Sequence, residues 1–212
     1  MKPGRKRKLV DEVCGKWQVS IRRACDALEF DRSTYHYRSR RSDQAALETN
    51  ETWAMDFVHD QLATGRKLRV LTIVDIFSRF SPALTPRFTF RGTDVVEILE
   101  GVRDEVGFPA TIRVDQGTEF VSRDLDVWAY QRGVTLDFSR AGKPTDNAFI
   151  KAFNGRFREE CLNAHWFLTL ADAEEKVETW RRYYNEERPH GAIGNKPPIL
   201  LQNHDGATGP PP

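Results

Sequence analysis

The order of its hydrophobic segments constrains the fold of this chain more than any other feature. Segments with the β-branched and aromatic character of strands come first, and strands and helices then alternate. The expected elements, in chain order, are strands at about 51–59, 68–76 and 81–88, a helix at 93–105, a strand at 110–115, a helix at 122–132 and a strand at 134–138. Consecutive strands followed by alternating strands and helices predict an α/β fold, with a five-stranded mixed sheet flanked by helices.

Two longer helices are expected after the last strand. The first covers about residues 148–163, and either Asp146 or Asn147 can cap it. The second covers about residues 170–186. Its apolar face, at helical spacing, is formed by Leu170, Ala173, Val177 and Trp180.

Two further segments have the composition of loops. Residues 139–145 form a polar, glycine- and proline-containing stretch typical of a mobile flap, and Arg140 and Lys143 are its cations. The last residues, 201–212, end in three prolines and are expected to be a disordered tail. The main globular domain is therefore predicted to cover residues 51–200.

The N-terminal part differs from the rest in charge. Residues 1–45 carry 12 Lys/Arg and 6 Asp/Glu, a net charge of +6, whereas residues 46–212 carry 20 and 25, a net charge of −5. A basic arm on a mildly acidic body suits a protein that meets a polyanion through one end, although a solvated positive tail has the same composition.

The N-terminal part is also expected to be mainly helical. Residues 1–8 are a polar, basic lead-in, and a helix follows at about 21–28, with Ser20 as its cap. A second short helix is expected at about 32–38, with Arg32 and Arg38 at its ends. This pair is compatible with a helix-turn-helix that reads DNA and equally with an ordinary helical hairpin. Residues 39–50 are polar and predict a linker.

Composition excludes several classes of protein. No stretch approaches the roughly 18 apolar residues of a membrane helix, and no apolar segment follows the basic N-terminus as in a secretory signal. The three cysteines are odd in number and contain no CxxC pair, which argues against a disulfide framework or a zinc ribbon. We therefore expect a protein of the reducing cytosol.

Two aspartates at strand positions are the candidate metal ligands. Asp56 lies within one expected strand and Asp115 at the end of another. Phosphodiester chemistry with two divalent ions about 3.5–4 Å apart needs such hard oxygen ligands and a further carboxylate from a neighbouring element. Asp75 also ends a strand, but it fits equally well as a turn cap or as an ion-pair partner.

From Glu51 to Pro198, about 70% of the chain, the sequence resembles the integrase-type catalytic core of bacterial insertion-sequence transposases. The subclass is the one whose transposase comes from two overlapping reading frames, with this chain as the second-frame part. The segments that carry the resemblance are Trp53–Phe57, Val74–Arg79, Asp115–Phe120, Lys143–Ile150, Phe153–Asn163 and Tyr184–Gly191. The resemblance implies an RNase H-like fold and DNA strand transfer with Mg²⁺ or Mn²⁺.

The family triad is two aspartates and a glutamate, with 35 residues between the second and the third. Asp56 and Asp115 match, but the glutamate position falls on Lys151. Arg158 matches the family's basic residue seven positions later, so the register is right and the glutamate is replaced. By this resemblance Arg158, Asn154 and the flap cations are expected to bind DNA, as are the two arginines of the N-terminal helix.

The resemblance also implies partners. These are DNA, as transposon ends and target, a first-reading-frame subunit and further copies of the chain on DNA, in the bacterial cytoplasm at the nucleoid. The sequence departs from the family in a second place, because only 12 residues separate Arg38 from Glu51, where the family has a further helical and basic stretch.

Lys151 should disturb a metal site, because it offers no acceptor and brings a positive charge. A like unit charge about 4 Å away costs roughly 4 kcal/mol at an effective dielectric of 20. The ammonium could instead pair with Asp56 and Asp115. As replacement ligands, Glu159 and Glu160 lie roughly 12–14 Å further along the helix and are too far, which leaves Glu119 and Asp146.

Three interpretations follow from this substitution. The first is a transposase by descent whose strand transfer is abolished or severely impaired. The second is an inactive binding protein that holds transposon ends or inhibits active subunits. A stand-alone RNase H-like nuclease is disfavoured, because Arg188, Pro189 and His190 belong to the transposase pattern.

Overall fold

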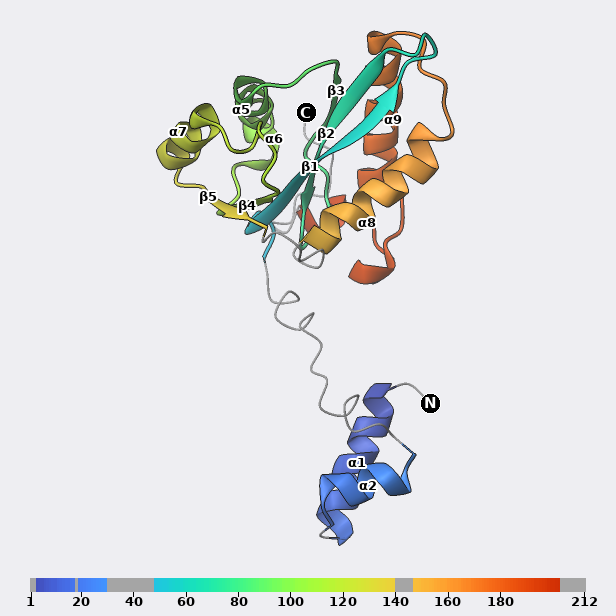
Figure 1. The fold of residues 1–212 in the computed structure, drawn as a ribbon. Helices are drawn as coiled ribbons and strands as arrows, with labels where there is room; N and C mark the ends of the chain where they lie inside the picture. The colour runs from blue at the N-terminus through green and yellow to red at the C-terminus, as the bar shows by residue number, and fades with distance from the viewer. Residues whose placement is uncertain (1–2, 18, 30–47, 140–146, 203–212) are drawn as a thin grey trace. The chain divides into compact units, whose positions relative to one another are not determined.

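The structure is a computed structural model that describes residues 3–17, 19–29, 48–139 and 147–202 (Figure 1). The chain divides into two compact units, residues 1–45 and residues 46–212. None of the helices in these described ranges is both long enough and apolar enough to cross a membrane.

The N-terminal unit contains two helices, α1 (Pro3–Trp17) and α2 (Ile21–Ala27). The Ser20 hydroxyl accepts a hydrogen bond from the Arg23 amide at 3.4 Å, as expected of a helix cap. The expectation of a lead-in over residues 1–8 was wrong, because α1 begins at Pro3. An apolar stripe packs α1 against α2, and it consists of Val10, Val13, Cys14, Ala24, Cys25 and Leu28. The expected second helix at 32–38 lies outside the described residues.

The second unit is built on a five-stranded mixed sheet, as predicted (Figure 1). Its strands are β1 (Thr52–Gln61), β2 (Lys67–Asp75), β3 (Leu84–Arg87), β4 (Thr111–Val114) and β5 (Thr135–Phe138). The order is β3-β2-β1-β4-β5. The first three strands pair antiparallel, whereas β4 pairs parallel to both β1 and β5.

Helices cover both faces of this sheet (Figure 1). They are α5 (Gly92–Gly101), α6 (Arg103–Val106), α7 (Arg123–Arg132), α8 (Ala148–Phe157), a π-helical turn (Arg158–Leu162), α9 (Leu170–Glu186) and α10 (Ile199–Gln202). The expected helix at 93–105 is therefore interrupted between α5 and α6. The expected helix at 148–163 changes from α-helical to π-helical winding at Arg158.

The alternation of side chains along β1 separates two cores. Ala54 and Val58 face a cluster with α8 and α9, whereas Trp53 and Met55 face a cluster with α5 and α7. Asp56 has the same parity as Ala54 and Val58, so it lies on the face that α8 covers.

The C-terminal boundary of the core lies beyond residue 200. Leu201 and Gln202, expected to belong to a disordered tail, are part of α10. The Gln202 amide donates to Asn50 Oδ1 at 3.2 Å, and the Thr49 hydroxyl donates to the Leu201 carbonyl at 3.1 Å. These contacts join α10 to the residues that enter β1.

Candidate active site

Asp56 lies in β1, and both of its carboxylate oxygens accept hydrogen bonds. The Phe57 amide donates to Oδ1 at 2.7 Å. The side-chain amide of Asn154, from α8, donates to Oδ2 at 2.9 Å. The backbone is held as well, because the Thr72 hydroxyl of β2 donates to the Asp56 carbonyl at 3.0 Å.

Asp115 follows β4 at the end of the strand, and the pairing of β1 with β4 brings it beside Asp56. The parallel pairing of β1 with β4 places Trp53 opposite Ile112 and Ala54 opposite Arg113. Two residues further on, the same register places Asp56 opposite Asp115, at a strand spacing of about 4.8 Å. The side chain of Asp115 is exposed to solvent.

The electrostatics of Asp56 agree with this placement. Burial raises its pKa, and the neighbouring charge of Asp115 acts in the same direction. The hydrogen bond from Phe57, the positive charge of Lys151 and the hydrogen bond from Asn154 all oppose the rise in the pKa. The two aspartates therefore repel each other across neighbouring strands, as two ligands of one cation do before the cation binds.

The turn after β4 positions Asp115 through Gly117. The Gly117 amide donates to Asp115 Oδ1 at 2.9 Å. A Cβ atom at Gly117 would lie only 3.0 Å from this same oxygen, so a side chain here would press on the carboxylate. Glycine therefore permits the close approach of the turn to Asp115.

Lys151 lies on α8 one turn before Asn154, and its side chain is exposed. The direct ion pair with Asp56 and Asp115 that the sequence suggested is not formed among the described residues. The positive charge of Lys151 instead acts on Asp56 through space, where it partly offsets the rise in the pKa of Asp56. The oxygens of Asp56 therefore accept hydrogen bonds from Phe57 and Asn154 and not from the Lys151 ammonium.

Glu119, which the sequence left open as a replacement metal ligand, is bound by Arg69 instead. Arg69 makes an ion pair with Glu119, and its guanidinium stacks on the Phe57 ring with a centroid distance of 4.1 Å. The pKa of Glu119 is lowered, first by the hydrogen bond from Arg69. Phe57 packs with the α5 and α7 cluster, on the sheet face opposite to α8.

Other candidate ligands do not complete the site. Asp146 lies outside the described residues. Among the residues that are described, no group of three or more His, Cys, Asp or Glu side chains is arranged to hold a metal ion.

Asp75 is a buried turn cap. Its carboxylate accepts hydrogen bonds from the Asn50 amide at 3.1 Å, the Phe77 amide at 2.9 Å and the Ser78 hydroxyl at 2.8 Å. Burial raises the pKa of Asp75, and these hydrogen bonds oppose the rise. Of the roles left open for Asp75, the structure thus shows the turn cap rather than the ion-pair partner.

Some of the expected DNA-binding residues lie at the site, and others lie outside the described residues. Arg158 is exposed at the start of the π-helical turn, and its guanidinium donates to the His59 carbonyl at 3.3 Å. Asn154 points its amide at Asp56, a contact that was not predicted from the sequence. Its spacing of three from Lys151, which places both residues on one side of α8, is the only sequence signal for it. Four further candidates, Arg32, Arg38, Arg140 and Lys143, lie outside the described residues.

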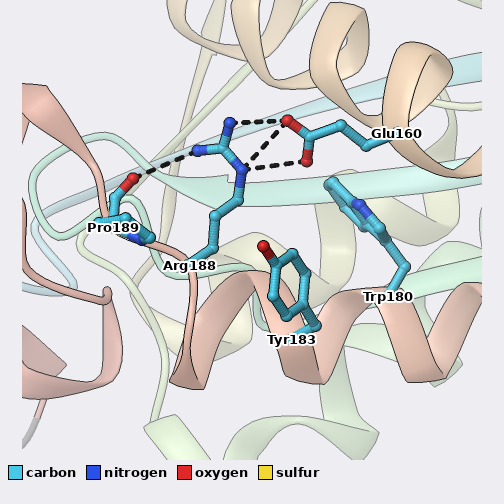
Figure 2. A pocket seen from close by; sticks show the side chains of 5 residues that line it. All are labelled: Glu160, Trp180, Tyr183, Arg188 and Pro189. Atoms are coloured by element: carbon cyan, nitrogen blue, oxygen red, sulfur yellow. Dashed lines mark hydrogen bonds and ion pairs between the residues drawn. The ribbon is translucent and has the colours of Figure 1, made fainter.

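The C-terminal motif forms a separate pocket, which is lined by Glu160, Trp180, Tyr183, Arg188 and Pro189 (Figure 2). Figure 2 shows the Arg188 guanidinium turned toward the Glu160 carboxylate, with a shortest distance of 2.6 Å. This ion pair ties the end of α9 to the π-helical turn after α8. It therefore supports the helix that carries Lys151 and Asn154.

Comparison with known proteins agrees with this geometry. Two profiles that are both described as an integrase core domain match residues 46–144 and residues 132–198. The insertion element IS407 uncharacterized 31.7 kDa protein of Burkholderia multivorans is 46% identical over 159 residues, which are 75% of this chain and 57% of the relative. The chain belongs to the integrase-core family of insertion-sequence transposases. The insertion element IS476 uncharacterized 39.2 kDa protein of Xanthomonas euvesicatoria is 44% identical over 73% of this chain and 44% of the relative.

The integrase-core chain thus spans about half the length of these curated relatives. Among solved structures, the integrase catalytic core domain of HTLV-2 in complex with magnesium is similar, with a TM-score of 0.57 and 15% identity over 74% of this chain and 98% of the other. The simian T-cell lymphotropic virus intasome in complex with PP2A regulatory subunit B56 gamma has a TM-score of 0.65 at 15% identity, over 100% of this chain and 77% of the other. These likenesses confirm the predicted RNase H-like fold.

Proposed function

We propose that this chain is a transposase of the two-aspartate, one-glutamate type whose DNA cleavage and strand transfer are impaired by Lys151. The observation that carries the proposal is the pair formed by Asp56 and Asp115. The register of β1 and β4 brings them together on the α8 face, and the charge of Asp115 contributes to the raised pKa of Asp56. Lys151 projects from the helix beside them, at the position where the family has its glutamate.

The side chains present fit one divalent cation better than two. Two carboxylates and the amide oxygen of Asn154 are hard oxygen donors of the kind that Mg²⁺ and Mn²⁺ take. The place of the third carboxylate is held by an ammonium, which cannot donate an electron pair while it is charged. Asp56 and Asp115 would hold the cation, and a bound cation would supply Lewis-acid polarisation of a DNA phosphate.

The remaining residues of the site would act on the DNA itself. Arg158 is exposed seven residues after Lys151, which is nearly two turns of helix, and its guanidinium suits a phosphate group. Lys151 adds a second cation on this side of α8. Together they would hold a DNA strand at the aspartate pair even where cleavage fails.

Strand transfer from a 3′-hydroxyl end tests the proposal directly. The unaltered chain and the Lys151→Glu variant are compared on the same transposon-end duplex with Mn²⁺. We expect product from the glutamate variant and at least 100-fold less from the unaltered chain, in the range seen when one essential catalytic group is lost. Lys151→Gln, which removes the charge without adding a carboxylate, is the matched control and should stay inactive. Strong strand transfer by the unaltered chain with Mg²⁺ would disprove the impairment.

A second candidate function is a DNA-binding or inhibitory transposase remnant, and the exposed cations Lys151 and Arg158 favour it. Retention of one terminal-repeat duplex over a scrambled duplex, measured by fluorescence anisotropy at fixed salt, distinguishes this function from a chain with no activity. We further propose the partners that the family implies, namely transposon-end and target DNA, a first-reading-frame subunit and further copies of the chain. The site of action would be the nucleoid in the bacterial cytoplasm.

A further inference from the structure

Only one of the two polar atoms of the Asn154 side-chain amide has a hydrogen-bond partner among the described residues. Its nitrogen donates to Asp56 Oδ2 at 2.9 Å. Its oxygen is buried and has no hydrogen-bond partner among the described residues. A buried acceptor without a donor costs free energy, so the conformation that holds Asp56 leaves an unfavourable group in the site.

The two ends of an asparagine amide have the same shape and exchange places when the amide turns by 180°. After this turn the oxygen of Asn154 faces Asp56 Oδ2, where the nitrogen was. Two oxygens at this separation repel each other unless a cation lies between them. Asp115 supplies a third oxygen donor, because the strand register places it beside Asp56.

We propose that Asn154 is a cation ligand of this chain, which turns its amide to present Oδ1 when a divalent ion binds to Asp56 and Asp115. The inference rests on the proposed function, since it uses the same pair of aspartates. Asn154 would replace, one helical turn further along α8, the oxygen that Lys151 cannot provide. The site would hold one ion, on the side of Asp56 away from Lys151.

A simpler role for Asn154 makes the opposite prediction. If Asn154 only clamps Asp56 as a hydrogen-bond donor, it competes with the cation for Oδ2. Removal of its side chain would then free that oxygen and tighten cation binding. If Asn154 is a ligand, removal of its side chain weakens cation binding, so the sign of the change separates the two roles.

The test is a titration of the full chain with Mn²⁺, followed by the electron paramagnetic resonance signal of the free ion, without DNA. The unaltered chain is expected to bind one ion, and Asn154→Ala to bind it about tenfold or more weakly, as is typical when one partner of a metal site is lost. Asn154→Asp, which keeps an oxygen at this position and adds a charge, should bind more tightly than the unaltered chain. Asn163→Ala, at the exposed end of the same helical segment, is the control and should leave the affinity unchanged.

Thermal unfolding of each variant without metal shows whether the fold is retained, and Asn154→Leu, which has a similar volume and no oxygen donor, carries the test if Asn154→Ala does not fold. No Mn²⁺ binding by the unaltered chain would overturn the inference, and so would unchanged or tighter binding by Asn154→Ala or weaker binding by Asn154→Asp. None of these outcomes depends on strand transfer. The metal-binding role of Asn154 and the effect of Lys151→Glu on strand transfer are therefore tested independently.

Discussion

Asp75 and Asp56 are both strand aspartates with raised pKa values, but their surroundings differ. Asp75 is fully buried and accepts three hydrogen bonds from donors of the turns around it. Asp56 is partly buried, accepts two hydrogen bonds and has the like charge of Asp115 as a neighbour. The hydrogen bonds to Asp75 compensate its charge within the fold. The repulsion between Asp56 and Asp115 is not compensated in this way, and a bound cation would relieve it. Asp75 therefore has a structural role and Asp56 is the candidate metal ligand, a difference that strand position alone does not show.

The largest expected effect is on Asp75. Asp75→Ala removes the shared acceptor of two backbone amides and one hydroxyl, and buried donors without acceptors are costly. We expect the free energy of unfolding to fall by about 2–4 kcal/mol. Urea denaturation followed by circular dichroism measures the change, and Ser139→Ala serves as a mild control on the same unit. A loss below about 0.5 kcal/mol would remove the distinction between Asp75 and Asp56.

His190 extends the comparison to a buried base. Burial lowers its pKa to about 4, from an ordinary value of about 6.5, and the side chain is only 7% exposed. Between these values the unfolded chain binds a proton that the folded chain does not, so stability should fall as the pH drops from about 6.5 to about 4. We expect a loss of about 2 kcal/mol in unfolding free energy over this interval, and His190→Gln should flatten the dependence. An unchanged slope in the variant would assign the pH effect to other groups.

Gly117 tests how closely the turn must approach Asp115. In Gly117→Ala the new Cβ would lie 3.0 Å from Asp115 Oδ1, so the carboxylate has to move. We expect Mn²⁺ affinity to fall by about three- to tenfold, or roughly 1 kcal/mol, with little change in thermal stability. Gly155→Ala, where a Cβ meets nothing within 4 Å, is the matched control. Equal affinities in the two variants would show that Asp115 does not depend on this turn.

The smallest expected effect on stability is at Asp56. Asp56→Asn removes the repulsion from Asp115, and the amide it creates can donate to Asn154 Oδ1 after that side chain turns. The free energy of unfolding should stay within about 1 kcal/mol of the unaltered chain or rise slightly, while Mn²⁺ binding is lost. Calorimetric unfolding and the Mn²⁺ titration check both parts. A marked loss of stability would make Asp56 a structural residue like Asp75.

Much of the fold could be predicted because its signals are local. The β-branched run of Leu68–Ile76 and the apolar face of α9 each follow the period of one element. Helix α1 was not predicted, because its first residues are basic and polar and its apolar stripe is short, consisting of Val10, Val13 and Cys14. The break at Arg158, where α8 changes to π-helical winding, has no comparable signal in the sequence.

The candidate site was predictable only in part. The sequence names Asp56, Asp115 and Lys151; in the structure Asp56 lies on the sheet face that α8 covers, Asp115 follows the neighbouring strand β4, and Lys151 lies on α8. Asn154 was assigned to DNA, and its contact with Asp56 was not foreseen because the two residues are 98 positions apart. Glu119 was kept as a replacement ligand, and only its pairing with Arg69, 50 positions away, removes it.

By itself the sequence determined which segments form most of the strands and helices, and that a lysine stands at position 151, with 35 residues between it and Asp115. Both follow from the identity and spacing of neighbouring residues, since side-chain periodicity and charge are properties of the chain. Only the tertiary structure decided that Asp75 is saturated by hydrogen bonds, that Glu119 is held by Arg69 and that Asn154 faces Asp56 with an unpaired oxygen. These contacts depend on the register between strands and on the way α8 packs across the sheet, and both are set by the whole core rather than by any one segment.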